Sequence, residues 1–315
     1  MSAPQSEIRN TVNPAYCATG IWAPLLMPLL ENLEPDPARM LALTEELLDS
    51  GCHGVALFGT TSEANSFSLA ERMEALEYLV KAGIDPARLM VGNGCCAYPD
   101  SLQLTRHCLE LGCHKVLMLP PFYYKDMSDE GLANSYSKVV EALGDTSLRI
   151  VLYHFPALSG VPITTGLIRI LCERHGPVIA GVKDSSGDWD NTRLLLESFP
   201  ELAIFPGTER LLLDGLECGA AGSITATANL TPGSIRGVYD SWLNHQGEAR
   251  AQQEQINRIR GVIQKTPMVP TLKHLTALRL KDSAWNRVRP PMVTLNAAAA
   301  SRLVTELHEA GLDFD

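Results

Sequence analysis

Lys183 is the residue whose type and position most directly suggest chemistry. An apolar run over residues 178–182 predicts a buried strand, and Lys183 follows it directly, ahead of a polar turn at 184–188. An amine at the inner end of such a strand is partly removed from water, which disfavours its charged form and leaves a nucleophile that can form a Schiff base with a ketone. The alternative, and the commoner role of a strand-end lysine, is an ion pair with Asp184.

Tyr153 lies thirty residues before Lys183, at the end of another apolar run over residues 150–152. This spacing is one strand-and-helix step, and neighbouring strands lie about 4.8 Å apart, so the two side chains can project side by side. A phenol beside the amine could carry protons while a Schiff base forms and a carbon-carbon bond breaks. Core packing is the alternative for Tyr153. His154 is expected on the opposite face, in a structural role.

Two further turns that follow apolar runs carry candidate side chains. Gly59, Thr60 and Thr61 form a turn of small residues, and consecutive backbone N–H groups in such a turn suit a carboxylate. An ordinary helix-capping turn would have the same composition. Tyr123, within the segment 120–124, would bring a second phenol to the same region, with aromatic core packing as its alternative.

The elements that must position these residues are predicted by alternating patterns from about residue 19 to residue 243. Short apolar runs rich in β-branched residues alternate with longer amphipathic stretches, which indicates eight strand-and-helix units. The predicted strands cover residues 19–26, 53–58, 88–93, 115–119, 148–153, 177–183, 202–206 and 220–224. This pattern favours an α/β fold of the (β/α)8 barrel type, whose catalytic residues lie at the carboxyl ends of the strands. The alternative is an open, doubly wound sheet, but residues 92–94 are too short for its glycine-rich phosphate loop.

Helix signals divide the chain into three parts. Ser68 followed by Glu71 predicts a capping box at the start of a helix over 68–81, and residues 101–111 and 164–173 also have helical spacing. Beyond the eighth unit, residues 246–264, 268–280 and 295–311 look helical, with breaks at Pro267, Pro270 and Pro290-Pro291. We therefore predict an N-terminal arm at 1–16, a barrel at 17–243 and a helical C-terminal extension at 244–315 that packs on the barrel.

Composition narrows the class of partner. The 315 residues include 26 lysines and arginines against 36 aspartates and glutamates, a net charge of −10, without a basic cluster. Because nucleic-acid binding rests on clustered positive charge, no nucleic-acid partner is expected. Apolar runs fall short of the roughly 20 residues that a membrane helix needs, so no membrane partner is expected either. Eight scattered cysteines are typical of reduced thiols, which favours a cytoplasmic protein.

Taken in order, these segments resemble the dihydrodipicolinate synthase and N-acetylneuraminate lyase family through nearly the whole chain. The matching motifs are Gly59-Thr60-Thr61-x-Glu63, Pro121-Phe122-Tyr123-Tyr124, Tyr153-x-x-Pro156, Lys183-Asp184-Ser185-Ser186-Gly187-Asp188 and the run from Gly222 to Asn229. Each motif alone is weak, whereas all of them in register are specific. The resemblance implies a (β/α)8 barrel that assembles as a homotetramer, a dimer of dimers, and that uses no metal or organic cofactor.

The resemblance also implies roles for individual residues. Lys183 would attack the ketone of pyruvate or of a pyruvate-derived substrate, and the Schiff base would serve as an electron sink for an enamine. Tyr153 would carry protons, with Thr61 and Tyr123 completing a hydroxyl relay, and Tyr123 would reach into the neighbouring subunit's site. The pocket would also include Thr60 and Thr61, through N–H groups on the substrate carboxylate, and Gly207 and Ile224, which would line its wall.

Some residues differ from the family pattern at positions that would bind the second half of the substrate. Leu158 stands five positions after Tyr153, where the synthase pattern has an arginine that grips the second substrate's carboxylate. The lyase reads sugar hydroxyls with an acidic pair and a serine, and those positions here hold Glu209, Arg210 and Ala226. We expect Leu158, Glu209 and Arg210 to contact a different or shorter acceptor, with a second anionic group near Arg210. A surface position on a helix is the alternative for Arg210.

Two smaller departures lie elsewhere. Ser62 stands where the family turn usually has glycine, and its side chain is expected to narrow or reshape the carboxylate loop. His154 stands where the family usually has asparagine. Neither change affects the expected nucleophile.

These observations predict a pyruvate-dependent class I aldolase or lyase. Its substrate would be a 2-oxo-3-deoxy sugar acid or a similar 2-oxo acid, with an aldehyde as the second partner. Two enzymatic alternatives use the same lysine: a dihydrodipicolinate synthase-like condensation and a sugar-acid dehydratase. A non-enzymatic alternative is a catalytically silent barrel that binds a 2-oxo acid. The aldehyde, the direction of the reaction and its stereochemistry do not follow from the sequence.

Overall fold

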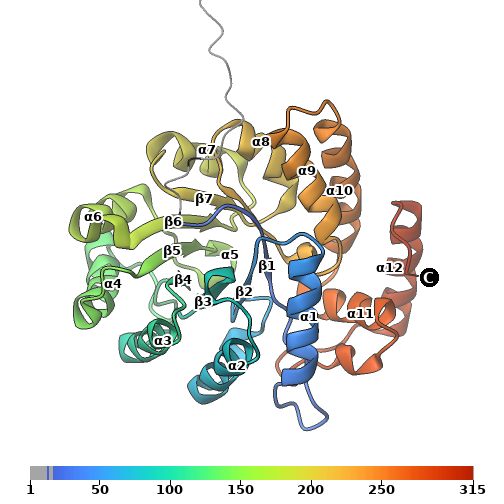
Figure 1. The fold of residues 1–315 in the computed structure, drawn as a ribbon, viewed down its shortest axis with the longest axis horizontal. Helices are drawn as coiled ribbons and strands as arrows, with labels where there is room; N and C mark the ends of the chain where they lie inside the picture. The colour runs from blue at the N-terminus through green and yellow to red at the C-terminus, as the bar shows by residue number, and fades with distance from the viewer. Residues whose placement is uncertain (1–12, 14–16, 315) are drawn as a thin grey trace, which may run out of the picture.

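Eight short strands form the centre of the computed structural model, which describes residue 13 and residues 17–314 (Figure 1). The predicted arm at 1–16 lies outside the described residues apart from Asn13. The strands are β1 Gly20–Pro24, β2 Gly54–Leu57, β3 Leu89–Gly92, β4 Lys115–Met118, β5 Arg149–His154, β6 Ile179–Asp184, β7 Ala203–Pro206 and β8 Gly222–Ile224. Every predicted strand is confirmed, with each end within two residues of its predicted position.

The strands form a parallel barrel. They follow the order β7-β6-β5-β4-β3-β2-β1-β8, and every paired neighbour runs parallel. The two ends of this order meet: the N–H of Ala221 donates to the carbonyl of Ile204 at 2.9 Å, and the Ser223 hydroxyl donates to the carbonyl of Pro206 at 2.8 Å. The predicted (β/α)8 barrel is therefore confirmed, and the open, doubly wound sheet is wrong.

Helices surround the strands. They are α1 Pro37–Asp49, α2 Leu69–Lys81, α3 Tyr98–Glu110, α4 Asp129–Leu143, α5 Pro156–Ser159, α6 Thr165–His175, α7 Trp189–Ser198, α8 Leu212–Glu217, α9 Pro232–Leu243, α10 Ala249–Ile263, α11 Met268–Arg279 and α12 Ala297–Glu309. The predicted capping box is present, because the Ser68 side chain accepts from the Glu71 N–H and the Glu71 side chain accepts from the Ser68 N–H. Pro270, predicted as a break, lies in the first turn of α11, where a missing N–H costs nothing.

Alternation along the strands separates two cores. Ile150 and Leu152 face outward into the layer between strands and helices, whereas Val151 and Tyr153 face the barrel interior. The interior cluster also includes Trp22, Ala56, Met90, Leu117, Phe205 and Ile224. Side chains packed in the barrel interior therefore support any functional side chain that points inward near the carboxyl end of a strand.

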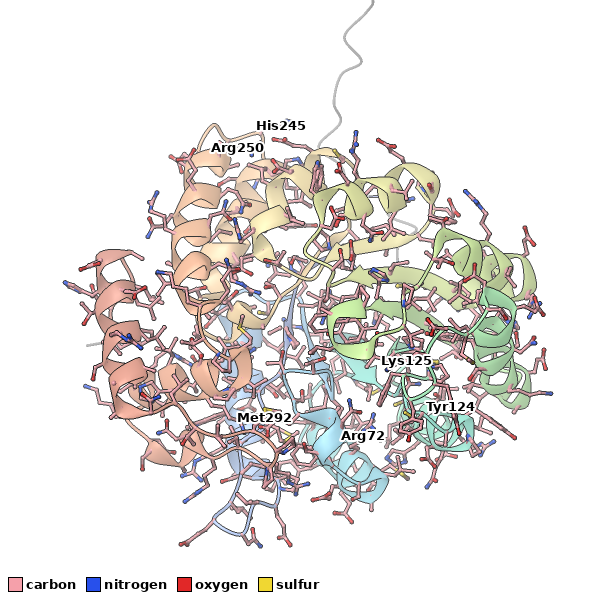
Figure 2. All side chains as sticks on the ribbon, turned by 180° about the vertical axis from the view of Figure 1, so that it is seen from behind. Arg72, Tyr124, Lys125, His245, Arg250 and Met292 are labelled. Carbon is pink, nitrogen blue, oxygen red and sulfur yellow. The ribbon has the colours of Figure 1, made fainter. Side chains whose placement is uncertain are left out.

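The C-terminal helices α10, α11 and α12 lie together along one side of the barrel (Figure 1). Arg250, at the start of α10, forms ion pairs with Asp214 at 2.7 Å and Glu217 at 3.0 Å, both on α8 (Figure 2). No helix formed by the described residues is both long and apolar enough to cross a membrane.

Candidate active site

Lys183 and Tyr153 lie side by side on adjacent strands. They are register partners in the β5–β6 pairing, and the Lys183 Nζ lies 4.3 Å from the centroid of the Tyr153 ring. Each residue is only 3% exposed. The amine therefore lies against the ring at the inner end of β6, shielded from bulk water. This is the arrangement that the thirty-residue spacing predicted.

The residues next to them along each strand point the other way and are structural. The Asp184 carboxylate accepts from the Asn191 side chain at 3.0 Å, the Thr192 hydroxyl at 2.7 Å and the Ser186 N–H at 2.9 Å. The alternative ion pair between Lys183 and Asp184 is therefore wrong. His154 Nδ1 accepts from the Ile163 N–H at 2.9 Å, and burial lowers the pKa of the imidazole. His154 has the structural role expected of it.

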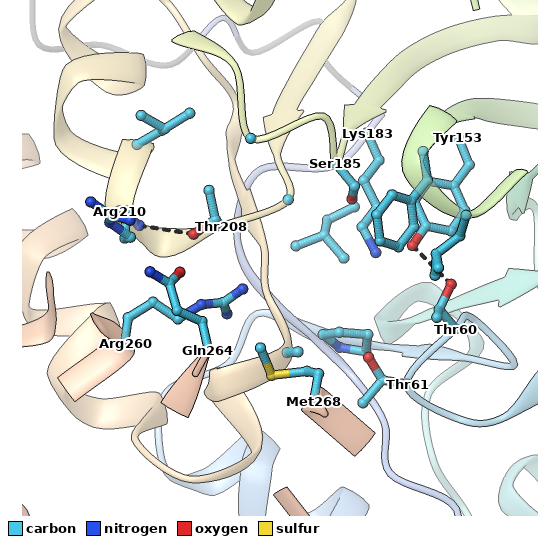
Figure 3. A pocket seen from close by; sticks show the side chains of 18 of the residues that line it. Thr60, Thr61, Tyr153, Lys183, Ser185, Thr208, Arg210, Arg260, Gln264 and Met268 are labelled. Carbon is cyan, nitrogen blue, oxygen red and sulfur yellow. Dashed lines mark hydrogen bonds between the residues drawn. The ribbon is translucent and has the colours of Figure 1, made fainter. Parts of the chain in front are cut away.

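The hydroxyl next to Tyr153 belongs to Thr60 and not to Thr61. The Tyr153 hydroxyl and the Thr60 Oγ1 are 3.1 Å apart, within hydrogen-bonding distance (Figure 3). Thr61, which we expected in this relay, lines the same pocket without a side-chain hydrogen bond to Tyr153 among the described residues. Two adjacent threonines on a turn project in different directions, and the sequence alone does not say which one faces the phenol.

The same turn offers two backbone donors. Within the described part of the chain, the N–H groups of Thr60 and Thr61 donate to no other group, while those of Ser62, Glu63 and Ala64 are bonded inside the turn. Free consecutive N–H groups beside a hydroxyl form a small anion-binding concavity. Their position at the pocket wall supports the predicted carboxylate contact.

The Ser62 side chain stabilises this loop through two hydrogen bonds. Its side chain is fully buried, accepts from the Phe58 N–H at 3.0 Å and donates to the Leu25 carbonyl at 2.5 Å. Phe58 and Glu63 flank the loop with positive φ angles of 56° and 59°. Such conformations are costly for residues other than glycine, so the surrounding contacts must hold them in place. Ser62 is not among the residues that line the pocket, and it ties this turn to the residues that directly follow β1 and β2.

The C-terminal extension also holds this loop. Glu63 forms an ion pair with Lys273 of α11, and both side chains are fully buried. The Arg289 N–H donates to the other Glu63 carboxylate oxygen at 2.8 Å, and Lys273 donates to the Arg287 carbonyl at 2.6 Å. Burial lowers the pKa of Lys273, an effect that the nearby Glu63 opposes. The loop that carries Thr60 is thus tied to residues more than 200 positions away.

A cavity of about 470 Å³ opens around the Lys183 amine (Figure 3). Gly207 and Ile224 line it, as predicted, and Leu158 and Arg210, the expected acceptor contacts, are also among its lining residues. The other lining residues are Pro24, Thr60, Thr61, Tyr153, Phe155, Ser185, Gly187, Thr208, Leu211, Ala226, Asn257, Arg260, Gln264, Met268 and Val269. Gly207 has a steric reason to be glycine, because a Cβ there would lie 2.2 Å from the Ser185 hydroxyl. Only a residue without a side chain keeps β6 and β7 this close.

Glu209 does not face the cavity, which corrects our expectation that it contacts the substrate. Its side chain is 2% exposed, and its carboxylate accepts from the hydroxyls of Thr225 and Thr227 and lies 3.3 Å from the Arg260 guanidinium. With both oxygens already bonded, the group has little capacity left for a ligand hydroxyl. Glu209 instead positions Arg260.

Arg260, Asn257 and Gln264 are pocket residues that the sequence reasoning missed. All three follow β8 in the chain, on or directly after α10, which we predicted only as part of an extension. Met268 and Val269 of α11 complete the same wall. The helical period of residues 246–264 was visible, but nothing in it indicated which turn of the helix meets the barrel mouth.

Tyr123 lies outside this cavity in the single chain. It is 73% exposed and packs edge to face against Tyr124, which is 69% exposed, with ring centroids 5.3 Å apart. The loop is held by Lys125, which donates to the Ser159 carbonyl of α5 at 2.6 Å (Figure 2). The chain thus leaves two phenols uncovered beside the mouth of its own barrel.

Comparison with known proteins identifies the family. Residues 17–310 match the dihydrodipicolinate synthetase family. The chain belongs to that family. A relative described as an uncharacterized DapA-like lyase, from Chloroflexus aurantiacus, is 37% identical over 296 residues, which cover 93% of this chain and 97% of the relative. A 4-hydroxy-tetrahydrodipicolinate synthase from Thermus thermophilus is 29% identical over 283 residues, covering 88% of this chain and 91% of that one.

A solved structure agrees with this assignment to the dihydrodipicolinate synthetase family. The dihydrodipicolinate synthase of Agrobacterium tumefaciens superposes with a TM-score of 0.86 at 29% identity, covering 93% of this chain and all of that one. The protein is therefore an enzyme of the aldolase and lyase class, and its whole barrel, with the C-terminal helices, belongs to the family fold.

Proposed function

We propose that this family member is a pyruvate-dependent class I aldolase or lyase that forms a Schiff base between Lys183 and a 2-oxo acid. The observation that carries the proposal is the juxtaposition of the Lys183 amine with the Tyr153 ring at 4.3 Å and of the Tyr153 hydroxyl with Thr60 at 3.1 Å. An isolated buried lysine could be structural. A buried lysine beside a phenol that is itself hydrogen-bonded to a second hydroxyl has the parts needed for amine addition and proton transfer.

The free N–H groups of Thr60 and Thr61 would orient the substrate by its carboxylate. The ketone carbon would then face Lys183 Nζ, which adds to it to form a carbinolamine. Tyr153, with Thr60 behind it, would deliver the proton with which the carbinolamine hydroxyl leaves as water, giving an iminium ion. A 2-oxo acid held at its carboxylate and its ketone projects the rest of its chain into the outer cavity, toward α10 and α11.

Cleavage would follow from the iminium ion. When the hydroxyl on C4 gives up its proton, the electrons of the C3–C4 bond move into the iminium, which becomes an enamine, and an aldehyde leaves. Protonation at C3 and hydrolysis then release pyruvate and restore the amine. The substrate class that we propose is a 2-oxo-3-deoxy sugar acid or a similar 2-oxo acid. Dehydration would use the same Schiff base with a hydroxyl as the leaving group, and product analysis separates the two.

Borohydride trapping tests the proposal. Incubation with pyruvate and borohydride should add one reduced pyruvate to the intact protein, with the adduct on Lys183 by peptide mass spectrometry and absent in Lys183→Ala. A panel of 2-oxo-3-deoxy acids should then yield free pyruvate with the native protein. Absence of any adduct would contradict the proposed chemistry and favour a silent binder, which would raise the melting temperature with pyruvate but release no product.

We further propose that the enzyme works as a homotetramer in which Tyr123 completes the relay of a neighbouring subunit. Tyr123 and Tyr124 are largely exposed, and Met127 on the same loop is 49% exposed. Large apolar side chains gathered on an exposed loop are typical of subunit contacts. In its own chain, Tyr123 does not line the cavity that holds Lys183.

A further inference from the structure

The outer end of the cavity is cationic. Arg210, Arg260 and the Gln264 amide lie together on the side of the pocket that faces away from Tyr153 and Thr60 (Figure 3). Arg210 follows β7, whereas Arg260 and Gln264 come from α10 and the residue that follows it. Elements far apart in the sequence thus bring two guanidinium groups to one place.

The Arg260 side chain is fixed in position by its contacts. Its side chain is 12% exposed, and the carboxylate of Glu209 lies 3.3 Å from its Nη1 atom. Its Nε atom is buried without a hydrogen-bond partner among the described residues. Arg260 also lines the cavity, and a guanidinium that is mostly removed from water is costly unless its donors are bonded, so the part of the group that lines the cavity favours an anionic ligand or water. Glu209 fixes the orientation of this group because Thr225 and Thr227 hold the carboxylate from the other side.

The charged residues that line the cavity favour an anionic ligand. Lys183, Arg210 and Arg260 line the cavity, and no aspartate or glutamate from residues 17–314 does. The Glu209 carboxylate, which does not line the cavity, neutralises the positive charge of Arg260. The Arg210 guanidinium has no ion pair or side-chain hydrogen bond among the described residues. Arg210 is exposed, so water solvates its guanidinium, and a ligand carboxylate that replaces this water would form a charge-assisted hydrogen bond.

Several large apolar side chains also line the cavity. Phe155, Leu158, Leu211, Met268 and Val269 line the cavity together with the polar groups. A polyhydroxylated chain would leave hydroxyls without partners against these side chains, which costs binding free energy. A carbon chain with few hydroxyls fits against these apolar side chains better.

We propose that the substrate is a 2-oxo dicarboxylic acid: one carboxylate is held beside Thr60 and Thr61, and the second, at the far end of a mainly apolar chain, by Arg210 and Arg260. The proposal rests on the Schiff-base function above and narrows its substrate class. The aldehyde released when the C3–C4 bond breaks then carries the second carboxylate. Arg210 binds it directly, and Glu209 acts as a positioning residue through Arg260.

Matched pairs of 2-oxo acids test the proposal. We would compare 2-oxoglutarate with 2-oxopentanoate, 2-oxoadipate with 2-oxohexanoate, and 2-oxopimelate with 2-oxoheptanoate, since each pair differs only in the distal carboxylate. Calorimetry without borohydride gives the affinity of each acid, and borohydride trapping separately reports Schiff-base formation at Lys183. We expect at least one dicarboxylate to bind about 10- to 100-fold more tightly than its monocarboxylate partner. Equal affinities within all three pairs would overturn the proposal.

Variants of individual arginines test which residues cause the preference for the dicarboxylate. Arg210→Gln should reduce the preference for the dicarboxylate to less than about threefold. Arg258→Gln changes an exposed arginine on α10 outside the pocket and should keep the full preference. Because Arg260→Gln would strand the buried Glu209, the conservative Arg260→Lys replaces it as the second pocket variant, and it should weaken the preference. An identical loss in Arg210→Gln and Arg258→Gln would assign the preference to overall charge and overturn the site.

The two readouts also separate this proposal from the proposed function. If no acid gives a borohydride adduct but the dicarboxylate preference survives in calorimetry and is lost in Arg210→Gln, the second carboxylate site stands and the Schiff-base function falls. If pyruvate gives the Lys183 adduct and no preference is measured, the function stands and the dicarboxylate proposal falls.

Discussion

The hydroxyls of Tyr153 and Thr60 lie 3.1 Å apart, although 93 positions separate the residues in the chain. Tyr153 lies near the end of β5 on an inward position, and Thr60 stands on the turn that follows β2, so the two reach each other across the carboxyl end of the barrel. The Lys183 amine lies against the same phenol. One tyrosine therefore contacts both the expected nucleophile and the hydroxyl that could pass a proton onward.

We predict that Thr60→Val slows proton transfer, whereas Thr61→Val does not. The substitution at 60 removes the hydroxyl bonded to Tyr153 and keeps the branched shape and the backbone N–H. Exchange of the pyruvate methyl protons with deuterated water, followed by NMR, measures enamine formation without any aldehyde. We expect the exchange rate to fall about 100-fold in Thr60→Val, the lower end of the contribution of a positioned proton-transfer group. A larger loss in Thr61→Val than in Thr60→Val would favour Thr61 as the relay residue.

The fold and the reactive pair could be predicted because their signals are local. Each strand is a short apolar run, and a strand-and-helix unit has a nearly constant length, so the spacing of Tyr153 and Lys183 is enough to place them on neighbouring strands. The predicted strand ends lie within two residues of the observed ones because polar turns follow the strands directly. The choice between Thr60 and Thr61 depends on the path of one turn, which composition does not encode.

The outer pocket could not be predicted, because it depends on where α10 packs. Glu209 and Arg210 are neighbours, yet one is buried against Thr225, Thr227 and Arg260 while the other lines the cavity. Arg260 lies on a helix with many charged residues, and only the docking of that helix on the barrel distinguishes it from Arg258. Long-range contacts of this kind leave no periodic trace in a single sequence.

Lys273 should control both stability and the carboxylate loop. Lys273→Met leaves the Glu63 carboxylate buried without its partner, and removing one member of a buried pair typically costs about 3–5 kcal/mol. We expect a lower free energy of unfolding in urea and a weaker affinity for pyruvate, because Glu63 flanks the Thr60 turn. The double variant Lys273→Met with Glu63→Gln should regain part of the stability. Additive losses in the double variant would mean that the two side chains are not coupled.

Gly207→Ala should damage the site by overpacking. The new Cβ would lie 2.2 Å from the Ser185 hydroxyl, 2.9 Å from the Ser185 Cα and 3.0 Å from the Asp184 carbonyl, so β6 or β7 must shift. We expect a loss of about 1–3 kcal/mol in stability and slower pyruvate exchange. Gly261→Ala is the matched control, since nothing lies within 4 Å of a Cβ at that position in α10, and alanine should stabilise the helix by roughly 0.5–1 kcal/mol. Full activity in Gly207→Ala would contradict this account of the pocket wall.

His53 should make the protein less stable in mild acid. Its Nδ1 accepts from the Ile21 N–H at 2.9 Å, and burial lowers the pKa of the imidazole from 6.5 to about 4. Above pH 6.5 both the folded and the unfolded forms are neutral, so the contribution to stability is complete. Between pH 6.5 and 4 only the unfolded chain takes up the proton, and stability falls.

The measurement for His53 is the melting temperature from pH 7 to pH 4. His53→Asn keeps a hydrogen-bond acceptor but does not titrate, so its melting temperature should depend less on pH than that of the native protein. His245→Asn, at an exposed turn, should follow the native curve. Parallel curves for the native protein and His53→Asn would show that another group controls the acid sensitivity.

Mixing two impaired variants tests whether Tyr123 acts across subunits. Lys183→Ala lacks the nucleophile, and we expect Tyr123→Phe to be at least tenfold slower in pyruvate exchange because it lacks the phenol proton. If Tyr123 serves the neighbouring site, a mixed pair holds one complete site, with Lys183 from one subunit and Tyr123 from the other. Random reassembly of equal amounts should then restore about a quarter of native activity, because half of the pairs are mixed and one of their two sites works. No recovery, despite confirmed mixing by native mass spectrometry, would place Tyr123 in its own subunit's site or outside the relay.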